Sequence, residues 1–451
     1  IKKAVAVTSV ETTTEALALS LNEKAKVDLS YMAQLTGKTE EKITESAVRL
    51  LTTRYLLGLF DGSEYDKIPY SVVECKEHID EALKMARKSC VLLKNDGVLP
   101  IDKTKVNTIG VIGPNADSRA ALIGNYHGTS SEYITVLEGI REEAGDDVRI
   151  LYSQGCDLYK DKVENLAWDQ DRISEAVITA ENSDVVILCV GLNETLEGEE
   201  GDTGNSDASG DKVDLHLPKV QEELIEKVTA VGKPTIVVLM AGSAIDLNYA
   251  QDNCNGILLA WYPGARGGRA IADLLFGKES PSGKLPITFY KDLEGMPEFT
   301  DYSMKNRTYR YMEKEALYPF GYGLTYSDTC VTEAEVVGEV SAESDIVLKA
   351  TVKNNGTVDT DEVVQVYIKD LDSPLAVRNY SLCGFKRVSL KAGEEKSVEF
   401  TISNKAMNIV DEDGNRYIAG KHFRLFAGVS QPDTRSAELT GHKPAEVEIA
   451  L

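Results

Sequence analysis

Cysteine is scarce in this 451-residue chain, which contains seven cysteines. They are odd in number, scattered, and without the close spacing of structural metal sites; they stand at positions 75, 90, 156, 189, 254, 330 and 383. We therefore expect reduced thiols that mostly lie in protein cores. We expect neither a metal site nor a cofactor.

The chain is also short of basic residues. It has 49 lysines and arginines against 73 aspartates and glutamates, which gives a net charge of -24 at pH 7. A polyanion is repelled by nucleic acid phosphates and by anionic membrane surfaces. The charge therefore argues against nucleic acid and membranes as partners and favours neutral or cationic ones, a description that sugars fit.

Long apolar stretches are missing as well. No run approaches the roughly 18 residues of a membrane-spanning helix, and the apolar stretch after Lys2 and Lys3 is too short for a signal peptide. Cytoplasmic residence is therefore the default expectation. Because the sequence begins at Ile1 and not at a methionine, we expect a fragment or a processed product.

The length predicts roughly three domains of about 150 residues each. Residues 1–42 form a polar segment whose apolar residues have helical spacing. A second helix is predicted over residues 43–60, where one broad apolar face ends at the turn signal Asp61-Gly62. Another helix is predicted over residues 77–89.

Between residues 90 and 290, short apolar runs alternate with helical intervals. Continuous β-branched runs are typical of strands covered on both faces; they occupy residues 106–112, 148–151, 185–190, 234–240 and 256–261. Connecting helices are predicted over residues 165–180, 217–231 and 267–276. This alternation predicts an α/β domain with a doubly wound, mostly parallel sheet.

After Tyr326 the pattern changes to an alternation of apolar and polar residues with turn residues between the runs. Strands are predicted over residues 346–352, 363–368, 386–390, 396–402 and 422–427. Short, regularly spaced strands of this kind predict an all-β sandwich of about 120 residues.

An acidic loop follows the predicted strand at 185–190. Residues 190–202 read VGLNETLEGEEGD and carry four glutamates, at positions 194, 197, 199 and 200. Ligands of parallel sheets bind beyond the carboxyl ends of the strands. Since no serine, cysteine or histidine stands beside these acids, proton transfer or cation binding suits the loop better than acyl transfer. The alternative is a solvated acidic loop without a function.

A series of ordered motifs runs through the chain from residue 86 onward. They are ARKSCVLLKNDGVLP at 86–100, VIGPNAD at 111–117, GNYHG at 124–128, LPKVQ at 217–221, GGRAIADLLFG at 267–277, PSGKLPIT at 281–288 and YPFGYGLTY at 318–326. With these motifs, the segment from residue 43 to the end resembles the carboxyl-terminal part of a glycoside hydrolase family 3 enzyme of the β-glucosidase or β-xylosidase kind.

The resemblance implies a (β/α)8-type barrel, an α/β sandwich domain and a fibronectin type III-like domain. We assign residues 86–290 to the sandwich domain, 291–330 to a connector and 331–451 to the fibronectin type III-like domain. Residues 43–85 resemble the last barrel helix and its exit. Nothing before them resembles the barrel, so we expect the barrel to be missing from this chain.

Residues 1–42 are foreign to that family. Residues 16–38 resemble a piece of large bacterial or phage-type helicases, although they carry no nucleotide-binding loop. We expect a small helical appendage, which a chimeric or fused gene would explain together with the missing barrel.

The resemblance also implies a retaining mechanism, with an aspartate nucleophile on the barrel and a glutamate acid/base on a loop of the sandwich domain. Glu197, which precedes Gly198, matches the acid/base position, and Glu199 and Glu200 are the alternates. The nucleophile is then absent from this chain. Without a barrel to cover it, we expect the acid/base carboxylate to be exposed and ionised.

Other candidate residues have a structural interpretation beside a functional one. Asn125, Tyr126 and His127 lie on a glycine-flanked loop, where they edge a sugar subsite or only shape the loop. Lys212 stands where relatives often have arginine, and since lysine lacks the planar guanidinium fork, we expect it to anchor the loop.

Two further patterns favour packing over binding. The glycines of residues 264–268 lack the spacing of a phosphate-binding loop, so they indicate a tight strand-to-helix turn with close packing. Tyrosines gather in one short span and indicate a packed connector more than a sugar-binding platform; they stand at positions 309, 311, 318, 322 and 326.

The sequence therefore predicts a family 3 protein that supplies the acid/base half of an exo-acting, retaining β-glucosidase or β-xylosidase site. Its partners would be a β-linked oligosaccharide or aryl glycoside and a missing or separate barrel domain. The alternative is a non-catalytic module that binds carbohydrate or docks on a separate barrel. An apolar face of the sandwich domain, left exposed by the missing barrel, motivates this alternative. Nothing in the sequence separates glucose from xylose.

Overall fold

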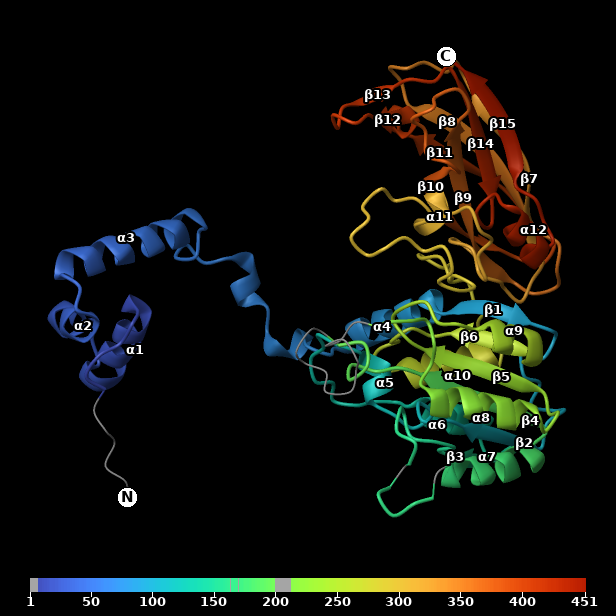
Figure 1. Ribbon diagram of the computed structural model, residues 1–451, viewed down its shortest axis with the longest axis horizontal. Coiled ribbons are helices and arrows are strands. Elements are labelled where there is room, and N and C mark those ends of the chain that lie inside the picture. Colours follow the sequence, from blue (N-terminus) through green and yellow to red (C-terminus); the bar gives the residue numbers. More distant parts are fainter. Residues whose placement is uncertain (1–6, 163, 169, 199–211) are drawn as a thin grey trace. The chain divides into compact units, whose positions relative to one another are not determined.

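The computed structural model describes residues 7–162, 164–168, 170–198 and 212–451. The chain divides into two compact units, Ile1–Cys75 and Lys76–Leu451 (Figure 1). Across the residues described, every helix is too short or too polar to cross a lipid bilayer.

The smaller unit contains three helices: α1 (Thr13–Lys24), α2 (Leu29–Thr36) and α3 (Glu40–Leu56). Side chains cap the amino-terminal ends of all three, and Thr12 forms a capping box with Glu15 at the start of α1. A small core joins them, formed by Ala16, Met32, Leu35 and Ile43. Two 3-10 turns follow, Glu64–Lys67 and Tyr70–Val72.

The predicted domain boundary between residues 42 and 43 falls inside α3. Thr39 accepts a hydrogen bond from the backbone of Lys42, so the helix begins at Glu40 and continues to Leu56 without a break. The boundary expected between residues 85 and 86 likewise falls inside α4 (Lys76–Ser89). Neither of these two boundaries therefore coincides with a gap between helices.

A six-stranded sheet forms the centre of the larger unit. Its strands are β1 (Val91–Asn95), β2 (Thr108–Ile112), β3 (Arg149–Ser153), β4 (Val185–Gly191), β5 (Thr235–Met240) and β6 (Gly256–Leu259). Their order in the sheet is β1-β6-β5-β4-β2-β3, and only β1 runs antiparallel to its neighbour within this order. The predicted mostly parallel sheet is confirmed.

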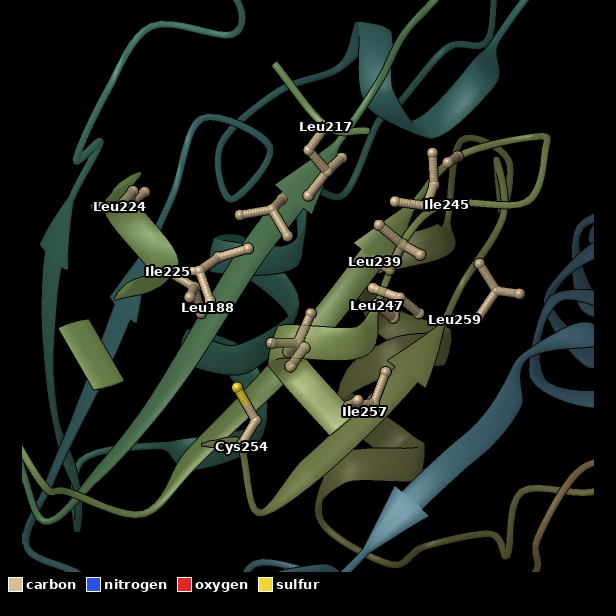
Figure 2. Packing of buried hydrophobic residues seen from close by; sticks show 14 of the residues in the cluster. Leu188, Leu217, Leu224, Ile225, Leu239, Ile245, Leu247, Cys254, Ile257 and Leu259 are labelled. Atoms are coloured by element: carbon tan, nitrogen blue, oxygen red, sulfur yellow. The ribbon is translucent and has the colours of Figure 1, made fainter. Parts of the chain in front are cut away.

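Helices cover both faces of this sheet (Figure 1). They are α4, α5 (Ala120–Ile123), α6 (Val136–Ala144), α7 (Asp171–Glu181), α8 (Lys219–Thr229), α9 (Asn248–Asn253) and α10 (Gly267–Leu275). Alternate residues of β4 enter different cores: Leu188 packs with α7 and α8, whereas Ile187 packs with α6 and α10. Figure 2 shows the first of these cores, in which leucines and isoleucines of β4, β5, β6 and α8 meet.

The glycines after β6 allow the close packing that the sequence predicts. A Cβ atom on Gly139 of α6 would lie 2.1 Å from the carbonyl oxygen of Gly268 in α10. A Cβ atom on Gly268 would lie 1.8 Å from the carbonyl oxygen of Thr135. Both positions exclude any side chain, because the two helices touch through their backbones.

The second half of the larger unit is a β-sandwich. Its strands are β7 (Thr329–Val337), β8 (Ile346–Asn354), β9 (Thr360–Asp370), β10 (Ser381–Leu390), β11 (Glu395–Ile402), β12 (Asn408–Val410), β13 (Arg416–Ile418), β14 (His422–Gly428) and β15 (Ala445–Ala450). One sheet has the order β10-β9-β14-β15, a second has β11-β8-β7, and β12 pairs with β13. A short helix, α12 (Thr434–Thr440), precedes β15.

The connector between the two halves is packed, as its tyrosines predict. Tyr318 and Tyr322 are fully buried and stack with their ring centroids 5.8 Å apart. Tyr309, in the short helix α11 (Thr308–Tyr311), stacks on Phe320 at 4.3 Å. These rings fill space between the α/β half and the β-sandwich and leave no open aromatic platform at these three positions.

Candidate active site at the carboxyl ends of the parallel strands

The acidic loop leaves the sheet where β4 ends at Gly191. Asn193 folds the loop back on itself, since its side chain accepts hydrogen bonds from the backbone and the hydroxyl group of Thr195. Its carbonyl oxygen accepts a further bond from the amide of Glu197, at 2.9 Å. Leu196 is buried in the core beneath, which turns Glu197 toward the ends of the neighbouring strands.

Three donors hold the carboxylate of Glu197. The amide of Gly242 and the hydroxyl group of Tyr262 both donate to Oε2, at 2.7 Å and 2.5 Å. The hydroxyl group of Ser243 donates to Oε1. Gly242 and Ser243 follow β5 and Tyr262 follows β6, so the three strand ends β4, β5 and β6 meet at this one carboxylate.

Glu197 is therefore half-buried and not exposed, contrary to the expectation from the sequence. That expectation assumed that only a barrel covers the loop. The cover comes instead from the strand ends of the same domain, which lie about 45 to 65 residues further along the chain.

Tyr262 and Lys212 have pKa values that their surroundings shift in opposite directions. Burial, together with the charge and the hydrogen bond of Glu197, raises the pKa of the Tyr262 phenol, so this group keeps its proton and acts as a donor. Burial lowers the pKa of Lys212, and the negative charges of Glu197 and Asp214 oppose that shift.

Lys212 anchors the loop, as the sequence predicts. Its ammonium group donates to the hydroxyl oxygen of Ser243 at 2.8 Å and to the carbonyl oxygen of Ala244 at 2.9 Å. The alternate acid/base candidates Glu199 and Glu200 lie outside the described residues.

The predicted sugar-subsite loop starts beside this site. Gly124 lies against Tyr262, because a Cβ atom there would come within 2.8 Å of the tyrosine ring. Asn125 is partly buried, whereas Tyr126 is 81 % exposed and His127 is exposed. The ring of His127 bonds the carbonyl oxygen of Gly128 at 2.9 Å. The loop is thus near Tyr262, and its role in sugar binding stays a prediction.

Sequence reasoning missed Ser243 and Tyr262 as site residues. Tyr262 directly follows one predicted strand and Ser243 is the third residue after another, and in a parallel sheet the carboxyl ends of neighbouring strands share one edge. That rule would have found them once the strand order was known. Gln221 was noted only as part of a motif; in the structure it bonds the backbone of Gly191, where the acidic loop begins.

Comparison with known proteins identifies the family of this site. Residues 90–326, which include the whole six-stranded sheet and most of the connector, match the glycosyl hydrolase family 3 C-terminal domain. The chain belongs to glycosyl hydrolase family 3. Residues 362–431 match the fibronectin type III-like domain, and residues 9–49 match the winged helix domain of a probable helicase.

Relatives in family 3 include xylosidases and glucosidases. A β-xylosidase of Formosa agariphila is 35 % identical over 415 residues, which cover 88 % of this chain and 55 % of the relative. The structure of a β-glucosidase from Erythrobacter marinus has a TM-score of 0.74 and 30 % identity, and the match covers 93 % of this chain and 57 % of that one.

A β-glucosidase of Listeria innocua, solved in complex with glucose, has a TM-score of 0.70 and 25 % identity; the match covers 94 % of this chain and 57 % of that one. The chain thus spans little more than half the length of the family 3 relatives that it matches.

Proposed function

We propose that this chain supplies the acid/base half of a retaining β-xylosidase or β-glucosidase site. The observation that carries the proposal is the acidic loop of a family 3 sandwich domain, fixed at the carboxyl ends of β4, β5 and β6 through Glu197. A carboxyl group of this loop would protonate the glycosidic oxygen as the bond to the anomeric carbon breaks. The candidates are Glu197, Glu199 and Glu200.

The second carboxyl group of a retaining site would come from a barrel domain. It would attack the anomeric carbon, and the pair must lie about 5 to 5.5 Å apart. The chain spans little more than half the length of its family 3 relatives, and the partner carboxylate would come from the part of those proteins that it does not match.

A chimeric protein tests whether this chain supplies the acid/base and a barrel domain supplies the second carboxyl group. Residues 43–451 would replace the matching part of the Formosa agariphila β-xylosidase, which keeps its own amino-terminal half. We expect the chimera to hydrolyse an aryl β-xyloside and its triple variant, Glu197→Gln with Glu199→Gln and Glu200→Gln, to lose about 100-fold or more. The rates on aryl β-xyloside and aryl β-glucoside would identify the preferred sugar.

The 451-residue chain alone is the control, and we expect it to show no turnover. Turnover by this chain would contradict the need for a second domain. A chimera that unfolds cooperatively but hydrolyses neither substrate would instead favour the alternative, a module without catalysis.

A further inference from the structure

The acidic loop and the residues after it, up to Lys212, are held at both ends by hydrogen bonds to the same residue, Ser243. Residues 199–211 are outside the described part of the chain, but their flanks, Glu197 and Lys212, both hydrogen-bond Ser243. Ser243 is the third residue after β5, at the edge of a buried sheet. Ser243 therefore contacts both flanks of the segment 199–211, one through Glu197 and the other through Lys212.

The chemistry of the three groups fixes the direction of each bond. An ammonium group has no acceptor, so Lys212 must donate to the hydroxyl oxygen of Ser243. The single hydroxyl proton of Ser243 is then directed to Oε1 of Glu197. A buried lysine thus orients the serine, and the serine orients the glutamate.

The other oxygen of Glu197 is also occupied, because the amide of Gly242 and the phenol of Tyr262 donate to Oε2. An ionised carboxylate has about four acceptor positions, and these bonds use three of them. A general acid must present its proton to the glycosidic oxygen within hydrogen-bond reach. The three donors instead hold Glu197 against the ends of β5 and β6 and leave a single acceptor position, on Oε1, unoccupied by these bonds.

We propose that Glu197 and Lys212 are positioning residues that clamp both ends of the acidic loop to Ser243, and that the protonating carboxyl group is not Glu197. The proposal rests on the proposed function for its catalytic meaning. The clamp itself rests only on the contacts of Glu197, Lys212, Ser243 and Tyr262.

Thermal unfolding of the full chain tests the clamp without any turnover. Glu197→Gln replaces one accepting oxygen by an NH2 group, which then faces a group that also donates. We therefore expect the melting temperature of the larger unit to fall by about 3 to 6 °C. Glu226→Gln, on the exposed face of α8, removes the same charge and should change it by less than about 1 °C. An unchanged or higher melting temperature for Glu197→Gln would overturn the proposal, because a functional acid is often replaced without loss of stability.

Hydrogen exchange tests whether the two ends are coupled. In folded Ser243→Ala, we expect faster amide exchange in both flanks, residues 192–198 and 212–216, and Ser243→Thr should restore the slow exchange because it keeps the hydroxyl group. Faster exchange in only one flank would show that the ends are held independently and would refute the clamp. Tyr262→Phe should speed exchange in residues 192–198 alone.

The pH profile separates positioning from proton donation. In a chimera that hydrolyses aryl β-xyloside, Glu197→Gln should lower kcat while the rate still falls at high pH, because the proton donor is still present. Loss of that alkaline fall would make Glu197 the acid and overturn the proposal. An inactive chimera would count against the proposed function only, since unfolding and hydrogen exchange judge the clamp separately.

Discussion

His216 lies between carboxylates just before α8 begins. Its Nδ1 atom is 2.9 Å from Oε1 of Glu222 and 3.9 Å from Oδ2 of Asp246. The hydrogen bond with Glu222 raises the pKa of His216; burial lowers it, but the charges of Glu222, Asp214 and Asp246 add to the rise. One exposed side chain therefore makes the stability of this region depend on pH.

The pH window follows from the direction of this shift. The pKa of His216 is higher in the folded state than in the unfolded state, where it is about 6.5. The stabilisation is therefore complete below that pH and disappears as the pH rises through the folded value. We expect His216→Gln to lower the melting temperature slightly at pH 5.5 and not at pH 9, since such a pair is largely solvated.

Calorimetry at low salt would measure this difference, with His78→Gln as the control for removal of an exposed histidine. An equal loss at both pH values would mean that packing, and not charge, is responsible.

At the scale of elements, α8 fixes the end of β4 through a single buried side chain. Gln221 accepts a bond from the amide of Gly191 at 2.8 Å and donates to its carbonyl oxygen, also at 2.8 Å. It donates to the carbonyl oxygen of Leu158 as well, at 2.6 Å. The residue from which the acidic loop departs is thus held by a helix that follows the loop in sequence.

Gln221→Leu has nearly the same volume but removes the side-chain partner of the two buried backbone groups of Gly191 and of the partly buried carbonyl group of Leu158. We expect it to lower the free energy of unfolding by about 3 to 5 kcal/mol, measured by urea denaturation. Lys227→Leu, on the exposed side of the same helix, controls for the change in helix composition. A loss below about 1 kcal/mol for Gln221→Leu would show that the backbone finds other partners.

The sequence predicts five of the six strands of the α/β half from their apolar runs, whereas β1 (Val91–Asn95) is not among the predicted strands. The predicted run at 185–190 and the observed β4 differ by one residue at one end. In contrast, β7 and β15 were not predicted, since their outer residues are mostly polar or partly exposed. Helix α6 was also missed; it is nine residues long and contains Gly139 in its interior.

The candidate site was predicted only in part, because some of its residues lie 45 to 65 positions apart in the chain. Glu197 is found because it lies in a local acidic loop of a recognisable family, and Lys212 because it stands where relatives often have arginine. Ser243 and Tyr262 contact Glu197 only after β5 and β6 have taken their places beside β4, and a sequence pattern contains no register between strands. The loop was therefore predictable, whereas the donors that bury its carboxylate were not.

At the scale of the whole larger unit, a buried ion pair joins its two halves. Lys284, in the PSGKLPIT motif near the end of the α/β domain, lies 2.7 Å from Oε1 of Glu362 in β9 of the β-sandwich. Lys284 also donates to the carbonyl oxygen of Gly323, and Glu362 accepts from Thr329 and from the amide of Val363. The lysine side chain is 9 % exposed and the glutamate 1 %.

Replacing only one partner of this pair leaves the other partner's charge buried between the two halves without a counter-ion. We expect Lys284→Met to lower the free energy of unfolding by about 3 to 5 kcal/mol, because Glu362 is then buried without its counter-ion. The double variant, Lys284→Met with Glu362→Gln, should recover most of that loss, since no net charge remains buried.

Urea denaturation followed by tyrosine fluorescence and by circular dichroism would measure both variants. Coincident transitions in the wild type that separate in Lys284→Met would show that the pair makes the α/β half and the β-sandwich unfold together, and additive losses in the double variant would contradict this coupling.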